Sequence, residues 1–392
     1  MSCYLVLNIF VCSVAVLLRI QRLHLEQVKV ALPIVLGVLN AISSEDDEKD
    51  FDTMNDLFIA SLNIGHSIQE ICQTMEGQKK EELCAILGLY TLQNIALLSR
   101  SRQKHIATNS SFLVTKFSQV LPFCGLSYFG LLTGSDYDEL CNKIHKVQSG
   151  IEDDDEFMDS FAYGINGSCL AVIWAHISED VAKATGEQLI VVFDEIRRER
   201  SKRWNVVGML KHMLSSIDYS WEIKSHVLDV LLSILYGIHR EEHNHYDEDF
   251  SIFMPNLFAS LKAIEKAIME APYPLLRKKA FSVFKKVVSD IPSSQRFDIL
   301  KALIVNSNSS SMIAILIDLV KDEVLVDTAQ ENSRKEQKCK EISPFWGSNA
   351  LAIIEMVLRP PNGGPPSLPD NSEPVCTTLQ LFCSIILLIF NF

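Results

Sequence analysis

Apolar residues recur every three or four positions from residue 24 to about residue 330, with polar residues between them. This is the period of an α-helix that buries one face. It predicts helices in the first part of the chain at 24–42, 54–75, 79–98, 104–119 and 136–148. After its charged start, the stretch 79–98 is apolar on almost every face, which is typical of a helix buried in a middle layer.

A repeated apolar pattern marks the region between residues 218 and 290. One predicted helix carries Ile223, Val227, Val230, Leu231 and Ile234, and the next carries Leu276, Ala280, Val283, Phe284 and Val287. Each position of the second set lies 53 residues after its counterpart, and a helix over 253–268 separates the two. HEAT and armadillo units run about 40–47 residues, and the polar loop 239–249 accounts for the excess. We therefore predict an all-α, HEAT/armadillo-like helical-repeat solenoid, whose units bury their apolar faces against one another.

Two shorter segments are less regular. Apolar residues four apart follow the acidic run 152–156 and predict a helix over 157–173, where acidic residues suit the positive end of the helix dipole. Residues 187–193 have the composition of a short strand. The charged helical stretch after them favours a helix instead.

Composition divides the chain into five parts. Residues 1–22 are an apolar segment, 23–200 are the N-terminal helical-repeat region, and 201–330 are the HEAT-like repeat region. A polar and Pro/Gly-rich linker over 331–375 holds a short helix near 349–358, and 376–392 form an apolar tail.

The two apolar ends allow more than one interpretation. Residues 1–22 suit either a first buried helix or an anchor, and 376–392 suit either a tail anchor or an aberrant end. The apolar runs inside them, 3–18 and 379–392, are shorter than the ~20 apolar residues that a bilayer span needs.

The charge of the chain bears on its partners. The net charge is −13, and the basic clusters 197–200 and 277–279 are short. Nucleic-acid binding needs a basic stripe that neutralises phosphates, so we expect no nucleic-acid partner. An acidic surface suits a basic patch on another protein.

The cysteines indicate the compartment. All ten lie outside any C-x-x-C pair, and most sit among apolar residues. A free cysteine in such a place behaves as a small hydrophobe, so a reducing compartment is the simpler interpretation. We expect a cytoplasmic and/or nuclear protein.

One motif has a catalytic form. Residues His239, Glu242 and His243 fit the H-x-x-E-H pattern of inverted zinc peptidases. That chemistry needs both histidines on one helix face, whereas Gly237 is expected to end the preceding helix. A solvated loop is favoured over adventitious metal binding or catalysis. Since no phosphate loop, dinucleotide fingerprint or serine elbow occurs, we expect no enzyme, no catalytic or metal residues and no cofactor.

Several stretches resemble one family. They are 65–72, 79–90, 137–140, 161–168, 203–210 and 221–237. Together they are similar to the aberrant lateral root formation protein 4/glomulin family over about residues 25–330. The resemblance implies a HEAT-like solenoid that binds the RING-box subunit of cullin-RING ubiquitin ligases. It also implies that binding masks the docking surface of the ubiquitin-conjugating enzyme, and that plant members support lateral root initiation.

The end of the chain is expected to depart from this family. Family members continue as a C-terminal solenoid that carries the RING contacts, whereas here the solenoid is predicted to stop near residue 330, or by 358. The tail after residue 375 does not resemble the family, so the chain is expected to be truncated. Partner-binding residues stay unknown at this point. The alternatives are a generic helical-repeat scaffold and a membrane-anchored adaptor, each with another protein partner.

Overall fold

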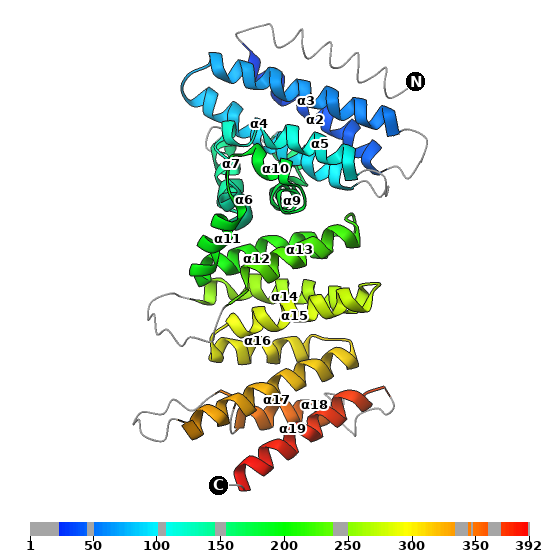
Figure 1. Ribbon diagram of the computed structural model, residues 1–392, viewed down its shortest axis with the longest axis vertical. Helices are drawn as coiled ribbons and strands as arrows, with labels where there is room; N and C mark the ends of the chain where they lie inside the picture. The colour runs from blue at the N-terminus through cyan, green and yellow to red at the C-terminus, as the bar shows by residue number, and fades with distance from the viewer. Residues whose placement is uncertain are drawn as a thin grey trace. The chain divides into compact units, whose positions relative to one another are not determined.

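The computed structural model describes residues 23–44, 51–100, 107–145, 154–237, 250–333, 344–345, 348–359 and 370–390. Every regular element in these ranges is a helix (Figure 1), so the all-α helical-repeat prediction is confirmed. The chain forms two compact units. The first consists of Met1–Ile238 with Lys266–Val283, and the second of His239–Glu265 with Phe284–Phe392.

Two helices that pack against each other form the centre of the first unit, α4 (Gln78–Arg100) and α9 (Gly164–Ile177). In α4 every residue from Glu82 to Ser99 is buried except Cys84, which confirms the predicted middle-layer helix. The helices packed around this pair are α2 (His24–Ser44), α3 (Phe51–Thr74), α5 (Ala107–Ser118), η1 (Pro122–Cys124), α6 (Tyr128–Thr133), α7 (Ser135–His145), α10 (Glu179–Ala184), α12 (Arg200–Ser215) and α13 (Trp221–Ile234).

Glycines allow the close approach of these central helices. A Cβ atom added at Gly167 of α9 would lie 1.9 Å from the backbone oxygen of Leu92 in α4. A Cβ atom at Gly88 would lie 3.1 Å from a methyl group of Leu140 in α7. The backbone contact at Gly167 leaves room for glycine alone, because a backbone atom cannot move aside as a side chain can.

Buried polar groups between α3 and α4 satisfy one another. Ser61 Oγ donates to Asn94 Oδ1 at 2.6 Å, and the Tyr90 hydroxyl donates to the Ser61 carbonyl oxygen at 3.0 Å. All three residues are buried. Because a buried polar group without a partner is costly, this network favours one register between the two helices.

The predicted helix over 157–173 is two helices, and that expectation was wrong. α8 (Asp154–Asp159) ends before a series of turns, and α9 begins at Gly164. Phe157 and Phe161 are nevertheless both buried, with their rings 5.1 Å apart in an edge-to-face arrangement. The two rings are four residues apart in sequence, but they touch across a turn and not along one helix. Periodicity alone cannot distinguish these two arrangements.

The remaining predicted elements of the middle of the chain are confirmed. Residues 187–193 enter α11 (Leu189–Arg198), a helix and not a strand. The repeated helix pattern corresponds to α13 and α15 (Pro274–Asp290), with α14 (Met254–Glu270) between them. Of the ten repeated apolar positions, nine are buried, and Ile223 is half-buried.

The second unit contains η2 (Phe250–Ile252), α16 (Ser293–Val305), α17 (Ser310–Ser333), α18 (Ser348–Leu358) and α19 (Ser372–Phe390). A buried ion pair joins α16 to α17, with Arg296 Nη1 at 2.5 Å from Glu323 Oε2. Arg296 also donates from Nε to the Ile291 carbonyl oxygen at 2.9 Å. The short helix predicted near 349–358 is confirmed as α18.

The helical array continues past the point where the sequence pattern predicted its end. α17 runs to Ser333, and α19 begins inside the predicted linker and packs against both α17 and α18. α19 buries Thr378, Leu381 and Ile385, which are three or four residues apart. The expected end near 330 or 358 was therefore wrong, because the apolar residues of the tail follow a helical period that lets one face pack against its neighbours.

Candidate interaction surface

The starts of α13 and α15 lie close together in the first unit (Figure 1). Lys279 Nζ, in the second turn of α15, donates to Ser225 Oγ at 2.7 Å and to Asp229 Oδ2 at 3.0 Å, both on α13. The chain turns that precede the two helices, 216–220 and 271–273, are therefore neighbours at one edge of this unit.

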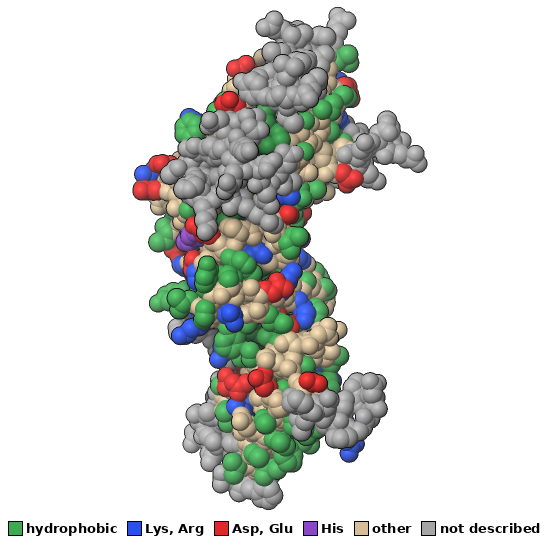
Figure 2. All heavy atoms as spheres, turned by 90° about the vertical axis from the view of Figure 1, so that its right-hand side faces the viewer, with side chains coloured by type: hydrophobic (Ala, Val, Ile, Leu, Met, Phe, Trp, Pro, Cys, Tyr) green, Lys and Arg blue, Asp and Glu red, His purple; other side chains and the backbone are tan. Residues whose placement is uncertain are grey.

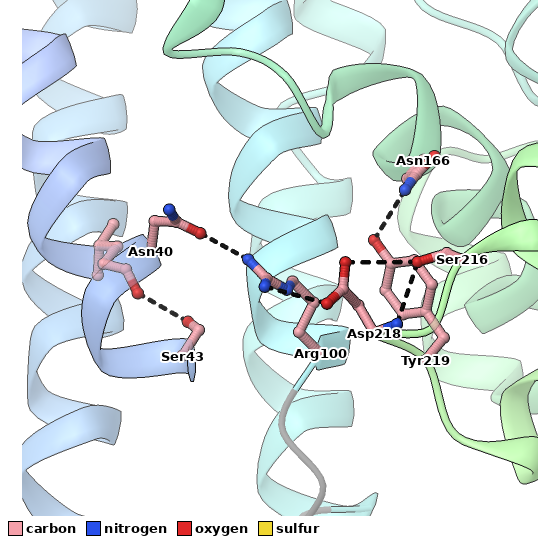
Figure 3. Close-up of polar contacts among 8 residues, drawn as sticks. Asn40, Ser43, Arg100, Asn166, Ser216, Asp218 and Tyr219 are labelled. Atoms are coloured by element: carbon pink, nitrogen blue, oxygen red, sulfur yellow. Dashed lines mark hydrogen bonds and ion pairs between the residues drawn. The ribbon is translucent and has the colours of Figure 1, made fainter. Parts of the chain in front are cut away.

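The first turn is held from the interior by Arg100 (Figure 3). Arg100, at the end of α4, donates to Asn40 Oδ1 on α2 at 2.5 Å and pairs with Asp218 Oδ1 at 3.2 Å. Its guanidinium also lies 4.4 Å from the centre of the Tyr163 ring. These contacts fix Asp218, so that its neighbour Ile217 projects outward with 77% of its surface exposed.

Tyr219 anchors the same turn on its other side. It is buried, and the Asn166 side chain of α9 donates to its hydroxyl oxygen at 3.3 Å (Figure 3). Ser220 then caps α13, because its Oγ accepts from the Ile223 N–H at 3.4 Å. An N-cap of this kind satisfies a backbone donor that the helix leaves unpaired. The residues that follow Ile217 are thus held in place by Arg100, by Asn166 and by the N-cap contact.

The second turn is held by hydrogen bonds that its own backbone carbonyl groups accept. Arg277 Nε donates to the Ala271 carbonyl oxygen at 2.9 Å, and the Leu276 N–H donates to the Tyr273 carbonyl oxygen at 3.0 Å. Exposed prolines flank Tyr273 on both sides and restrict the backbone. Tyr273 is 67% exposed and Leu275 is 82% exposed, although Leu276 beside them is buried.

Charged and aromatic groups lie between the two turns. Lys224 of α13 is buried, and its ammonium lies 4.7 Å from the centre of the Trp221 ring. Burial lowers the pKa of Lys224, the nearby Lys266 adds to this, and Glu270 opposes it. Since Lys266 and Glu270 lie on α14, the end of α14 is close to the start of α13.

We use the name turn surface for five side chains of this edge: the exposed Ile217, Met269, Tyr273 and Leu275, and the half-buried Trp221. Figure 2 faces the side on which the two turns lie, and it shows hydrophobic side chains among basic and acidic ones. Apolar and aromatic side chains gathered in this way mark protein-binding sites, and Trp and Tyr are frequent among the residues that dominate binding energy. The arrangement suits holding a partner.

The apolar pattern of the sequence indicates no partner-binding residue, and the turn surface explains why. Leu275 precedes Leu276, the first residue of the buried face of α15. Periodicity alone does not tell which of these two adjacent leucines is exposed. The signal that was present is the Pro272-Tyr273-Pro274 segment, which places an aromatic side chain on a rigid turn.

The catalytic pattern 239–243 lies outside the described residues. In the part of the chain that the structure describes, no group of three or more His, Cys, Asp or Glu side chains is placed to hold a metal. The interpretation of the pattern as a solvated loop stays a prediction.

Residues 207–387, which include the turn surface, match a family described as "Uncharacterised protein family, YAP/Alf4/glomulin". The chain is 40% identical over 368 residues to aberrant root formation protein 4 of Arabidopsis thaliana, which covers 94% of this chain and 55% of that protein. The chain is thus similar to the YAP/Alf4/glomulin family. Glomulins of Homo sapiens and Mus musculus are each 22% identical over 120 residues, 31% of this chain and 19% of theirs. The chain thus spans about half the length of its plant relative.

The family match corrects one expectation about the C-terminal tail. The matched region extends to residue 387, so the prediction that the chain departs from the family after residue 375 was wrong. The tail belongs to the YAP/Alf4/glomulin pattern and to the packed second unit.

Two described helices are long and apolar enough to cross a bilayer, His24–Ser43 and Gln78–Arg100. The second is 94% buried and serves as the central helix of the first unit, and the first is 39% buried. Core helices pass the same test, so these two are weak evidence for a membrane. The segment 1–22 lies outside the described residues, and an anchor at either end stays a prediction.

Proposed function

We propose that this chain binds the RING-box subunit of cullin-RING ubiquitin ligases and slows ubiquitin transfer by occlusion. Similarity to the YAP/Alf4/glomulin family supports the proposal, together with the resemblance that the sequence itself carries. The observation that carries the binding role is the turn surface, where apolar and aromatic side chains stand on turns that are fixed by hydrogen bonds and an ion pair.

Occlusion is a physical mechanism that needs a rigid surface and no covalent step. A surface ordered before binding loses little conformational entropy on complex formation. The Arg100–Asp218 pair and the Arg277–Ala271 hydrogen bond supply that order for the two turns. The net charge of −13 would favour encounter with a basic patch on the partner.

In a plant, the proposed role is support of lateral root initiation through control of ubiquitin transfer. The name of the plant relative, aberrant root formation protein 4, supports this part of the proposal. We place the protein in the cytoplasm and/or nucleus, in keeping with cysteines that are free among the described residues.

The test is binding of the full chain to a purified RING-box–cullin pair, with ubiquitin transfer followed in the same mixture. We expect micromolar or tighter binding that slows transfer. The double variant Tyr273→Ala/Leu275→Ala should bind at least about tenfold more weakly, because truncating a central apolar anchor costs more than 1 kcal/mol.

The matched control is Ile190→Ala/Val191→Ala, which removes two exposed apolar side chains from α11. It should bind and inhibit as the natural chain does. If folded natural chain does not bind the pair, the RING-box partner is wrong. If both double variants bind the RING-box–cullin pair as well as the natural chain does, the proposed partner is supported and the turn surface is not the contact.

A further inference from the structure

A buried lysine at the turn surface has no anionic partner. Lys224 lies in the first turn of α13 and is 7% exposed. Its ammonium is 4.7 Å from the centre of the Trp221 ring, and it makes no hydrogen bond or ion pair with any residue that the structure describes. Since removing a charge from water is costly, buried charges are normally paired. The counter-ion of Lys224 is therefore not supplied by this part of the chain.

The neighbouring carboxylates are engaged by other basic groups. Their ion pairs are Asp218 with Arg100, Asp229 with Lys279, and Glu270 with Lys266. Glu222 is exposed, but it lies two residues from Lys224, so the two side chains do not face each other on the helix. The charge of Lys224 is thus available to a carboxylate from another molecule.

The start of α13 offers further donors at the same place. The Ile223 N–H donates to Ser220 Oγ, whereas the N–H groups of Trp221 and Glu222 have no acceptor among the described residues. Side chains of a helix lean toward its N-terminus, and the ammonium of Lys224 accordingly lies beside the ring of the first helical residue. Free N–H groups and the helix dipole favour an anion at this end.

Apolar side chains flank these donors. The helices α13 and α15 start at the same edge and run in the same direction (Figure 1), and Lys279 donates to Ser225 at 2.7 Å. One turn before these two residues are Leu275 on α15 and Trp221 on α13, so the exposed leucine lies near the ring. A partner seated on both would exclude water from the ammonium, which strengthens a charge-assisted contact.

We propose that the start of α13 binds an acidic side chain of the protein partner, which Lys224 selects while the turn surface holds the apolar residues around it. The inference rests on the proposed function and names the chemistry of its contact: an aspartate or glutamate flanked by apolar residues. The net charge of −13 does not oppose this. At 0.15 M salt, exposed charges more than about 8 Å apart are largely screened, so the local ammonium decides which group is accepted at contact.

A binding role predicts opposite effects of one substitution on stability and on binding. Lys224→Met keeps the apolar stem and removes the buried charge. We expect its thermal unfolding midpoint to equal or exceed that of the natural chain, because an unpaired buried charge does not stabilise the fold. A lower midpoint would show that the ammonium serves folding and would count against the proposal.

Two labelled peptides test the site without any assumption about the partner. Fluorescein-labelled Leu-Phe-Asp-Leu-Phe and Leu-Phe-Asn-Leu-Phe, each with a blocked C-terminus, differ only in the central carboxylate. By fluorescence anisotropy, the full chain should bind the aspartate peptide at least about fivefold more tightly, a modest effect for a hydrogen bond between charged groups. Lys224→Met should bind the two equally. Equal binding by the natural chain, or binding of neither peptide, would overturn the proposal.

The matched control is Lys301→Met, which removes an exposed lysine from α16 in the second unit and changes the net charge equally. It should keep the preference for the aspartate peptide. Lys224→Arg, which keeps the charge, should keep it too. Loss of the preference in Lys301→Met would trace it to overall charge and not to the start of α13.

Binding to the RING-box–cullin pair separates this inference from the proposed function. Lys224→Met should bind the pair at least about tenfold more weakly than the natural chain, as expected for loss of a buried charged contact. If the natural chain prefers the aspartate peptide but does not bind the pair, the acidic site is supported and the RING-box partner is wrong. If Lys224→Met binds the pair as the natural chain does, the partner is supported and the acidic contact is wrong.

Discussion

His176, a half-buried histidine of α9, couples folding of the first unit to pH. His176, in the last turn of α9, has its ring centre 6.3 Å from that of His226 and 6.4 Å from that of Phe193. Burial lowers the pKa of His176, His226 lowers it further, and Asp229 opposes both. The unfolded chain therefore takes up a proton at this residue more readily than the folded chain does. Stability is complete above the ordinary histidine pKa near 6.5 and declines as pH falls below it.

Replacing His176 by glutamine should reduce this pH dependence. We expect the fall in unfolding midpoint between pH 7.5 and pH 5.5 to be smaller in His176→Gln than in the natural chain, because the residue that resists protonation is gone. Thermal unfolding followed by circular dichroism measures it. His66→Gln changes an exposed histidine on α3 and is the control. Identical pH profiles for all three proteins would rule out His176 as the cause.

At the scale of elements, α19 has one face that is buried and apolar residues on another face that are exposed. Thr378, Leu381 and Ile385 are buried against α17 and α18, whereas Leu379 and Leu387 are exposed. The Ser311 hydroxyl of α17 also donates to Glu373 Oε2 of α19 at 2.5 Å. Packing of one face is thus what makes this helix part of the second unit.

Leucine truncation on the two faces should therefore have different costs. Leu381→Ala should lower the free energy of unfolding by about 2–5 kcal/mol, through lost burial and the cavity left behind. Leu387→Ala, on the exposed side of the same helix, should stay within about 0.5 kcal/mol of the natural chain. Urea unfolding measures both, and equal losses would mean that α19 is not packed as described.

At the scale of the whole molecule, charge selects the kind of partner. The chain has 36 basic and 49 acidic residues. Several basic side chains are occupied within the protein: Arg197 Nε donates to the Ser233 carbonyl oxygen, Arg203 Nη1 to the Arg197 carbonyl oxygen, and Lys279 pairs with Asp229. The excess of acidic side chains would therefore repel a polyanion such as a nucleic acid.

We expect no measurable binding of the full chain to duplex DNA or RNA at 150 mM salt. Fluorescence anisotropy with a labelled 30-nucleotide duplex should give a dissociation constant weaker than about 100 µM, the weak end of nonspecific binding. Saturable binding in the micromolar range with a steep salt dependence would show a basic stripe that the charge pattern does not predict.

Much of the fold could be predicted where the helical period was long and uninterrupted. The predicted helix 79–98 is α4 within two residues at each end, and the predicted helix 349–358 is α18 within one. The prediction failed at Phe161, where a turn preserves the four-residue spacing, and in the tail, where apolar content obscured the period of α19. In both cases the apolar positions were recognised and the backbone path between them was not.

The sequence by itself determined the helical class of this protein, its family and the apolar positions that must be buried, because these depend on local periodicity and on residue identity. Only the tertiary structure decided which of two adjacent leucines stays in water. Leu276 is 7% exposed and Leu275 is 82% exposed. It also decided that Arg100 supports a turn 118 residues further along the chain. Such choices depend on which surfaces of distant helices come together, and the spacing of residues along one helix carries no information about its neighbours.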